Sequence, residues 1–215
     1  YMNTIKKLIN IILKIFNLKL IKIVDQFDNS YRLILGLNEK KINYILDVGA
    51  NNGQFVEQLR FYGYKEDIIS FEPLLSAHEK LKKNSKKDDR WRVFKPVALG
   101  NENRKNSINI SKNSVSSSIL NISQTHIDNA PDSIFVEKQS IDERKLEDIF
   151  FELDVENKKI FLKIDTQGYE YQILEGSKNI LNKIEGILVE VSLIELYEGQ
   201  KKWLDVIKFI ENNGF

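Results

Sequence analysis

The sequence predicts a single α/β domain with a doubly wound, mostly parallel sheet and helices on both faces, preceded by an amphipathic helix. From Lys41 onward, short β-branched runs alternate with stretches of helical period, which is typical of parallel strands joined by crossover helices. A chain of 215 residues is also long enough for one such core. We therefore expect a helical segment over residues 1–40 and one domain over residues 41–215.

The first segment is basic and amphipathic. Apolar side chains recur at nearly helical spacing from Ile5 to Phe16, with lysines and asparagines on the opposite face. Because these polar residues interrupt the apolar run, we expect neither a signal peptide nor a membrane span. The helix either makes peripheral contact with an anionic membrane surface or a partner, or packs on the domain or in a homodimer. We favour the second arrangement.

The remaining elements follow from changes in hydrophobic period. The expected strands are Tyr44–Val48, Asp67–Phe71, Arg92–Val97, Ile160–Ile164 and Gly186–Val191. The expected helices are Gln54–Tyr62, Leu74–Asn84, Asp142–Phe151, Tyr169–Asn182 and Lys201–Asn213. Between Gly100 and Gln139 the pattern weakens into a stretch rich in serine and asparagine, with short strand candidates at Ser107–Ile110 and Ser133–Glu137. Substrate-specific structure is expected in this stretch.

Composition excludes several classes of protein. The chain has no cysteine, so disulfide scaffolds, zinc ribbons and thiol nucleophiles are excluded, and a reducing, cytoplasmic location is expected. Its two histidines, His78 and His126, are too few for a multi-histidine metal site, so we assign no metal-binding residues, and carboxylate-bound Mg²⁺ stays open as an alternative. A net charge of +1 with both signs interspersed argues against a nucleic-acid partner.

The strongest motif is a buried strand that ends in Asp47 and continues through a glycine-bounded turn into a helix. In a doubly wound, Rossmann-like sheet this turn lies at the carboxyl edge, where ligands bind. Gly49 and Gly53 are spaced Gly-x-x-x-Gly instead of the Gly-x-Gly-x-x-Gly of dinucleotide sites. An acid at this position repels a diphosphate but suits a cation. We therefore expect S-adenosylmethionine, which carries ammonium and sulfonium charges, in preference to NAD or FAD.

A second acid supports this interpretation. Glu72 ends the second predicted strand 23 residues after Gly49, the distance at which nucleotide-binding folds place a carboxylate on the ribose, and Pro73 then stops the strand. The alternative role for Glu72 is an N-cap of the next helix. Small and aliphatic residues after the third strand are expected near the adenine. The predicted cofactor-binding residues are Asp47, Gly49, Asn51, Gly53, Phe55, Glu72, Pro73, Ala98 and Leu99.

Further motifs occur in order along the chain. They are Asp-Val-Gly-Ala-Asn-x-Gly-x-Phe at Asp47–Phe55, Phe-Glu-Pro at Phe71–Pro73, Val-Ala-Leu-Gly at Val97–Gly100, Ser116–Leu120, Leu-Lys-Ile-Asp-Thr-Gln-Gly-Tyr-Glu at Leu162–Glu170, Ile173–Gly176, Glu190–Ser192 and Leu196–Gln200. On these motifs the chain resembles the FkbM family of S-adenosylmethionine-dependent methyltransferases. The resemblance implies O-methylation of a hydroxyl on a saccharide or another small molecule, in polysaccharide or natural-product assembly.

The family pattern departs from this chain at two places. Methyltransferase sheets of this type normally end with a further hairpin, whereas this sequence stops at Phe215, so we expect its last strands to be missing. Many family members carry an acid where this chain has Gln167, which keeps hydrogen bonding but loses the charge. A catalytic carboxylate is therefore not available at position 167.

Two acids at strand ends are the predicted catalytic residues. Asp165 follows the fourth strand and Glu190 the fifth, so both open over the edge that holds the glycine turn. Either can accept the proton of the acceptor hydroxyl. The alternative roles are an N-cap for Asp165 and a sheet-edge ion pair for Glu190. Glu170 is as well explained by the dipole of the helix it begins.

Other residues carry weaker predictions. His126 has a pKa range suited to proton transfer, but a solvated surface role is favoured, and His78 on its lysine-rich helix is expected to be solvated. Ser114–Ser118 either binds a ligand or forms a flexible loop. Tyr197, Gln200 and Trp203 either form an acceptor-facing surface or, in the case of Trp203, belong to the core.

Two alternatives to a methyltransferase remain open. The first is an α/β enzyme that binds NAD or a nucleotide sugar, which the glycine spacing argues against. The second is a cofactor-binding scaffold without turnover.

Overall fold

The computed structural model describes residues 29–215, so the predicted N-terminal amphipathic helix lies outside the described residues. The α-helices are α2 (Asn29–Glu39), α3 (Gln54–Phe61), α4 (Leu75–Ser85), α5 (Gln124–Asn129), α6 (Leu146–Ile149), α7 (Glu170–Glu175) and α8 (Trp203–Asn212). The strands are β1 (Tyr44–Val48), β2 (Asp67–Phe71), β3 (Trp91–Val93), β4 (Ala98–Leu99), β5 (Arg104–Ser111), β6 (Phe135–Arg144), β7 (Ile160–Ile164) and β8 (Ile184–Val189). No helix in this part of the chain is long and apolar enough to cross a membrane.

A five-stranded parallel sheet forms the centre of the molecule. Its order is β3-β2-β1-β7-β8, with β1 paired to β2 on one side and to β7 on the other. The chain builds outward from β1 through β2 to β3, and then returns to place β7 on the opposite side of β1. This reversal creates a switch point at the carboxyl ends of β1 and β7. The predicted doubly wound, Rossmann-like architecture is confirmed.

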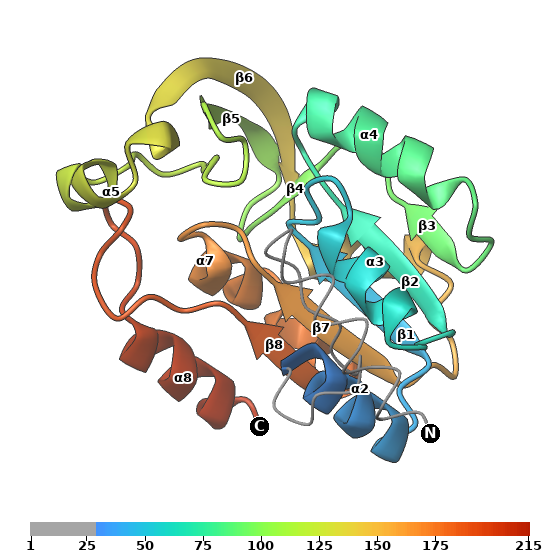
Figure 1. Ribbon diagram of the computed structural model, residues 1–215. Coiled ribbons are helices and arrows are strands. Elements are labelled where there is room, and N and C mark those ends of the chain that lie inside the picture. Colours follow the sequence, from blue (N-terminus) through green and yellow to red (C-terminus); the bar gives the residue numbers. More distant parts are fainter. Residues whose placement is uncertain (1–28) are drawn as a thin grey trace, which may run out of the picture.

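Helices cover both faces of this sheet because alternate side chains of each strand point to opposite sides. On one face, Ile45, Ile68 and Phe161 share a core with residues of α2, α3 and α4. On the other face, Leu46 and Leu162 belong to a core that includes residues of α6, α7 and α8. Figure 1 shows α3 drawn over β1 and β2, α4 at the upper right, and α7 and α8 at the left.

A second, smaller sheet occupies most of the predicted polar stretch. Its order is β4-β6-β5, and β5 and β6 run antiparallel at the top of the molecule in Figure 1. The candidate Ser107–Ile110 is part of the longer strand β5, whereas only residues 135–137 of the candidate Ser133–Glu137 belong to β6, since Ser133 ends a 3-10 turn. Ile108 and Ile141 of this sheet pack with Leu74, Ala77 and Ala98, which closes the small sheet against α4. Most other side chains of β5 and β6 are exposed or partly exposed. These strands therefore lack the apolar runs by which a strand is predicted from sequence.

Two predicted boundaries are wrong around this small sheet. The strand expected over Arg92–Val97 ends at Val93, and Ala98 and Leu99 belong to the small sheet instead. Pro96, between them, cannot donate to a strand ladder. The helix expected from Asp142 begins only at Leu146, because residues 142–144 form the end of β6, where residues 142 and 143 pair with β5 and residues 143 and 144 with β4.

Helix α7 is also shorter than expected. It ends at Glu175, and the rest of the predicted helix forms a 3-10 turn at Lys178–Lys183. A Cβ atom on Gly176 would lie 1.8 Å from the carbonyl oxygen of Gly100, so the chain crosses there at a distance that only glycine permits. The helix therefore ends where it meets the loop that enters the small sheet.

Glu143 joins the small sheet to the main body. Its side chain is fully buried and accepts hydrogen bonds from Arg104 Nε (2.9 Å), Asn106 Nδ2 (2.7 Å) and Tyr169 Oη (2.9 Å). Arg104 and Asn106 belong to β5, whereas Tyr169 immediately precedes α7. One carboxylate thus connects β5, β6 and the loop that follows β7.

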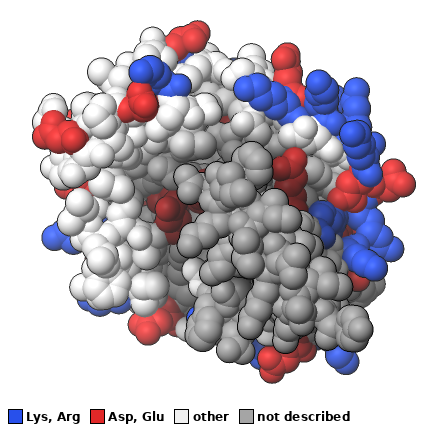
Figure 2. All heavy atoms as spheres, in the orientation of Figure 1, with Lys and Arg blue, Asp and Glu red and all other residues white. Residues whose placement is uncertain are grey.

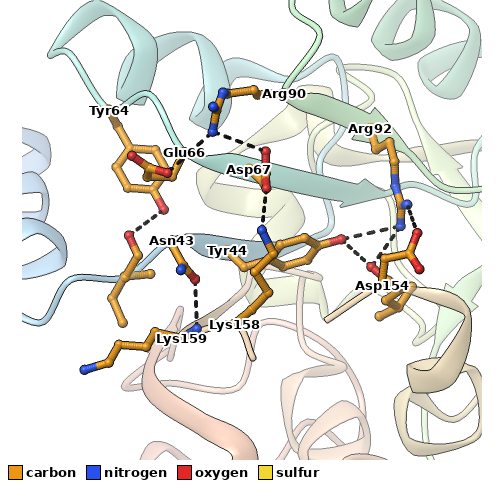
Figure 3. A network of polar contacts seen from close by, with 12 residues as sticks. Asn43, Tyr44, Tyr64, Glu66, Asp67, Arg90, Arg92, Asp154, Lys158 and Lys159 are labelled. Atoms are coloured by element: carbon orange, nitrogen blue, oxygen red, sulfur yellow. Dashed lines mark hydrogen bonds and ion pairs between the residues drawn. The ribbon is translucent and has the colours of Figure 1, made fainter. Parts of the chain in front are cut away.

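Polar groups at the amino end of the main sheet form a second network (Figure 3). Lys158 Nζ lies 2.9 Å from Asp67 Oδ2, and Arg92 donates to the carbonyl oxygen of Leu153 and pairs with Asp154. Tyr44 Oη donates to the same Leu153 carbonyl at 2.6 Å. These contacts join the amino ends of β1 and β2 to the segment that precedes β7.

Charge is mixed over most of the visible surface. Figure 2 shows lysine and arginine side chains gathered at the upper right, over α4. Lys82 and Lys83 in the last turn of that helix are exposed.

Candidate active site

A cavity of about 310 Å³ opens at the carboxyl edge, between the switch point and the small sheet. This volume lies at the lower end of the range of roughly 300–1,000 Å³ that small-molecule sites occupy. The predicted cofactor-binding residues that line it are Gly49, Asn51, Phe55, Glu72, Pro73, Ala98 and Leu99. Ile108, Val115 and Ile119 complete an apolar wall, and Asp165 and Gln167 lie among the polar lining residues.

The glycine turn brings the end of β1 against the end of β7. Gly49 has φ 76°, and a Cβ atom there would lie 1.8 Å from the carbonyl oxygen of Asp165. The amide of Asp165 in turn donates to the carbonyl oxygen of Val48. Only glycine fits this left-handed conformation and this approach. The turn therefore fixes the backbone of the catalytic candidate.

Gly53 has a different role from the one predicted. It does not line the cavity, and a Cβ atom on it would lie 2.4 Å from the ring of Trp91. Its φ of 97° begins helix α3 in the left-handed region. The second glycine of the motif thus serves the packing of α3 on the sheet.

Glu72 lies at the end of β2 and is almost fully buried. Its Oε2 accepts from the amide of Asn51 and its Oε1 from the amide of Leu74, both at 2.8 Å. Burial raises the pKa of Glu72 to about 7, although these two amide donors oppose the shift. A carboxylate offers about four lone-pair positions, so two remain for hydroxyl groups of a ligand.

The sequence predicts that Asp47 binds the cofactor, but its side chain does not line the cavity. It is fully buried and lies between its register partners Ser70 and Lys163, with Ser70 Oγ at 2.9 Å and Lys163 Nζ at 3.1 Å. Trp91 Nε1 donates to Ser70 Oγ and extends the row across a fourth strand. The acid of the motif therefore neutralises a lysine of this chain, and its charge reaches a ligand only through that lysine.

Lys163 is a residue that the sequence prediction missed. Its ammonium group lies 3.1 Å from the carbonyl oxygen of Gly49, 3.7 Å from Asp165 Oδ2 and 5.4 Å from the ring centre of Phe55. Burial alone would lower the pKa of Lys163, but the charges of Asp47 and Asp165 outweigh it and raise the pKa. A single lysine in an apolar strand two residues before a predicted catalytic acid could have indicated this role.

Asp165 and Glu190 come together as predicted from adjacent strand ends. Gln167 Nε2 donates to Asp165 Oδ1 and to Glu190 Oε2, each at 3.0 Å. Burial alone would raise the pKa of Asp165, but Lys163 and the hydrogen bonds from its neighbours lower it. The hydrogen bond with Asp165, together with burial, raises the pKa of Glu190 to about 7. The pair can therefore exchange a proton near neutral pH.

Glu170 has a structural role. It is buried, and its Oε1 accepts from the amides of Thr166 and Gly168 at 2.9 and 3.1 Å. Burial raises the pKa of Glu170. The carboxyl group thus shapes the turn that carries Asp165 and Gln167.

The two histidines differ from their expected surface roles. His78 is buried on α4, with Nε2 2.7 Å from the carbonyl oxygen of Phe94, so the prediction of a solvated side chain is wrong. His126 is half-buried, and its ring packs edge-on against Tyr197 at 5.1 Å. Neither histidine lines the cavity.

The serine cluster is an ordered loop. Ser116, Ser117 and Ser118 are buried and hydrogen-bonded, for example Ser116 Oγ to Ser133 Oγ at 2.9 Å. Tyr197, expected at an acceptor-facing surface, is fully buried behind this loop. Trp203, for which the core was favoured, is 38% exposed on α8. In residues 29–215, no group of three or more histidine, aspartate and glutamate side chains is placed to hold a metal ion.

Comparison with known proteins identifies the family. A model of the methyltransferase FkbM domain matches residues 47–215, from the glycine turn to the last residue. The chain belongs to the FkbM methyltransferase family. The resemblance of the sequence motifs to this family is thereby confirmed, and so is the prediction that the chain is a methyltransferase.

Two individual proteins are similar to this FkbM chain. The 2-O-methyltransferase NoeI of Sinorhizobium fredii is 29% identical over 176 residues, covering 79% of this chain and 72% of that protein. A crystal structure described as a caffeoyl-CoA O-methyltransferase from Staphylococcus aureus is 9% identical, with a TM-score of 0.42 over 96% of this chain and 77% of the other. That likeness is distant, so the fold described above rests on the strand order of this FkbM chain.

Proposed function

We propose that this FkbM chain transfers a methyl group from S-adenosylmethionine to a hydroxyl group of a saccharide or similar small molecule. The observation that carries the proposal is the position of two carboxyl groups, Glu72 and Asp165, around one switch-point cleft. Glu190 does not line the cavity and is joined to Asp165 through Gln167. NoeI, by its name a 2-O-methyltransferase, supports transfer to oxygen.

The residues present fit S-adenosylmethionine. Glu72 has lone pairs left for the ribose hydroxyls, and Ala98, Leu99 and Ile108 give the apolar contact that an adenine needs. Asn51 Oδ1 is buried without a hydrogen-bond partner beside the cavity, so it can accept from a bound donor. The acids around the cleft disfavour the diphosphate of NAD or of a nucleotide sugar.

The chain's own groups would bind and orient both substrates. When bound, S-adenosylmethionine supplies a methyl group on a positively charged sulfur. Asp165 would bind the acceptor hydroxyl at the cavity side of the pair and receive its proton, while Glu72 and Asn51 hold the cofactor. Ser114, Thr166 and Gln167 give this part of the cleft a polar lining, which suits an acceptor rich in hydroxyl groups. Positioning alone supplies roughly 7–11 kcal/mol to such a displacement.

Ligand binding tests the cofactor class. S-adenosylhomocysteine at 100 times its Kd should stabilise the protein by about 2.7 kcal/mol, measured as a rise in Tm, whereas NAD should give no shift. Stabilisation by NAD alone would contradict the proposal.

Methyl transfer from labelled S-adenosylmethionine to a panel of free sugars and methyl glycosides tests the reaction. Asp165→Asn should lower the rate by about 10²–10⁴-fold and leave the affinity for S-adenosylhomocysteine within about threefold. The matched control is Asp205→Asn, an exposed aspartate in the first turn of α8, which should retain the parental rate. An unchanged rate in Asp165→Asn would remove Asp165 from the mechanism. Binding without any transfer to the panel would favour the scaffold interpretation over an enzyme with this acceptor class.

A further inference from the structure

We propose that Gln167 is a positioning residue: its side-chain amide, oriented by Tyr197, holds Asp165 and Glu190 side by side so that they act as one proton acceptor. The inference rests on the proposed function, in which the two carboxyl groups serve the acceptor hydroxyl.

The orientation of the Gln167 amide follows from its partners. Both carboxyl oxygens that it faces can accept, and Lys163 keeps Asp165 ionised, so the NH₂ group must point toward Asp165 and Glu190. Its Oε1 then lies 3.0 Å from Tyr197 Oη, which donates to it and also lies 3.1 Å from the carbonyl oxygen of Ser116. If the amide were flipped, its Oε1 would face Asp165 Oδ1 and Glu190 Oε2, which are themselves acceptors. This orientation is therefore excluded.

The backbone of Gln167 is held as firmly as its side chain. Its φ of 58° is in the left-handed region, which costs a residue with a Cβ atom on the order of 1–3 kcal/mol. Ser118 Oγ donates to its carbonyl oxygen at 2.7 Å, and Glu170 accepts from the amides on either side, those of Thr166 and Gly168. Three separate segments therefore maintain a strained conformation that aims one amide at two carboxyl groups.

The amide solves an electrostatic problem in the carboxyl pair. Two adjacent carboxylates repel each other, and their proton affinity rises unless donors stabilise the ionised form. The ammonium group of Lys163 lies 3.7 Å from Asp165 Oδ2. The two protons of Gln167 Nε2 make one hydrogen bond to each carboxylate. A third carboxylate at position 167 would add repulsion where this chain places a neutral donor.

Several other titratable groups face the pair. Glu170 raises the pKa of Glu190, while Lys163 lowers it. The hydroxyl of Tyr197 is buried and its pKa is raised, so it stays protonated and donates to Gln167. His126 reaches only the ring of Tyr197. Gln167 and the protonated Tyr197 are therefore neutral groups beside charged ones.

The proposed step is a simple proton transfer. As the acceptor oxygen bonds to the methyl carbon and the electron pair of the broken C–S bond stays on sulfur, the hydroxyl proton passes to the carboxyl pair. Gln167 takes no part in this exchange and remains bound to both carboxyl groups.

The titration of Glu190 tests the proposal without an acceptor. In protein labelled with ¹³C-glutamate, Glu190→Gln identifies the carboxyl signal, which should titrate near pH 7. In Gln167→Leu and in Gln167→Glu, the titration midpoint of Glu190 should rise by roughly one pH unit. Each substitution removes the amide hydrogen-bond donors that stabilise the ionised carboxyl groups. Gln58→Leu, an exposed position on α3, is the matched control and should leave the midpoint unchanged.

Two further measurements keep the result interpretable. If Gln167→Leu does not fold, Gln167→Glu still accepts from Tyr197 and carries the test. S-adenosylhomocysteine binding within about threefold of the parent in the folded variant would show an intact cofactor site, whereas failure of the parent itself to bind would contradict the proposed function instead. A Glu190 midpoint that is the same in the parent and the folded variant would overturn the positioning role.

Discussion

Single buried charges set the chemistry of this cleft at the residue scale. Lys163 takes the charge of Asp47 and reaches Asp165, and Glu72 is held by backbone amides alone. Because burial raises the pKa of Glu72 from 4.5 to about 7, the free folded protein binds more protons than the unfolded chain between these values. This group therefore lowers stability as the pH rises through that window, and a hydroxyl donor on Glu72 would offset the cost.

Affinity for S-adenosylhomocysteine should accordingly increase with pH. Glu72 is mostly neutral at pH 6 and mostly ionised at pH 8, so calorimetry should show binding that strengthens by up to about tenfold between them. Glu72→Ala should bind weakly and lose this dependence, whereas Glu190→Gln should keep it. An identical pH dependence in Glu72→Ala would show that another group is responsible.

Elements meet at this site through glycines as much as through side chains. Gly53 (φ 97°) is the N-cap of helix α3 and Gly63 (φ 94°) follows its last turn, so both glycines lie in the left-handed region. They differ in their surroundings, since a Cβ atom on Gly53 would lie 2.4 Å from Trp91 and one on Gly63 would meet nothing within 4 Å. Backbone strain and crowding can therefore be separated on one helix.

Substitution of these two glycines should give unequal losses of stability. Gly63→Ala should lower the free energy of unfolding by about 1–2 kcal/mol through backbone strain alone. Gly53→Ala should lose a further 1–3 kcal/mol or so, because the ring of Trp91 must move. Urea denaturation measures both values. Equal losses would show that Trp91 yields without cost.

The sequence predicted the elements of the main sheet well and those of the small sheet poorly. β1, β2 and β7 are apolar runs buried on both faces, and their bounds match the prediction. β6 consists mostly of exposed or partly buried polar residues, so its last three residues, 142–144, resemble the start of a helix in the sequence, and only their pairing with other strands shows that they belong to β6. At the site, strand-end acids were predictable from spacing, whereas Lys163 and the Gln167–Tyr197 contact depend on segments brought together only by folding.

At the scale of the whole molecule, two sheets share one cleft. The main sheet provides the glycine turn, Glu72 and Asp165, and the small sheet provides the apolar wall at Ala98 and Ile108. Glu143 is fully buried where the small sheet meets the loop after β7. The closed cleft therefore depends on a carboxylate that does not line it.

Glu143→Ala should uncouple the two sheets. It removes the buried acceptor of Arg104, Asn106 and Tyr169, so we expect a loss of roughly 3–5 kcal/mol in unfolding free energy and weaker binding of S-adenosylhomocysteine. The adjacent Asp142→Ala is the matched control, since its ion pair with Lys105 is exposed and should contribute less than about 1 kcal/mol. Chemical denaturation and calorimetry measure both effects. Similar losses in the two variants would show that burial of Glu143 is not what joins the sheets.

The rim of the cleft offers one position that is free of these constraints. Val115 lines the cavity with its side chain half exposed, and its neighbours in the serine loop are anchored by hydrogen bonds among themselves. A library randomised at Val115 would therefore vary the shape of the entrance while the glycine turn, Lys163 and Gln167 stay in place. Evolution of a new acceptor preference in this scaffold has its least costly starting point at that side chain.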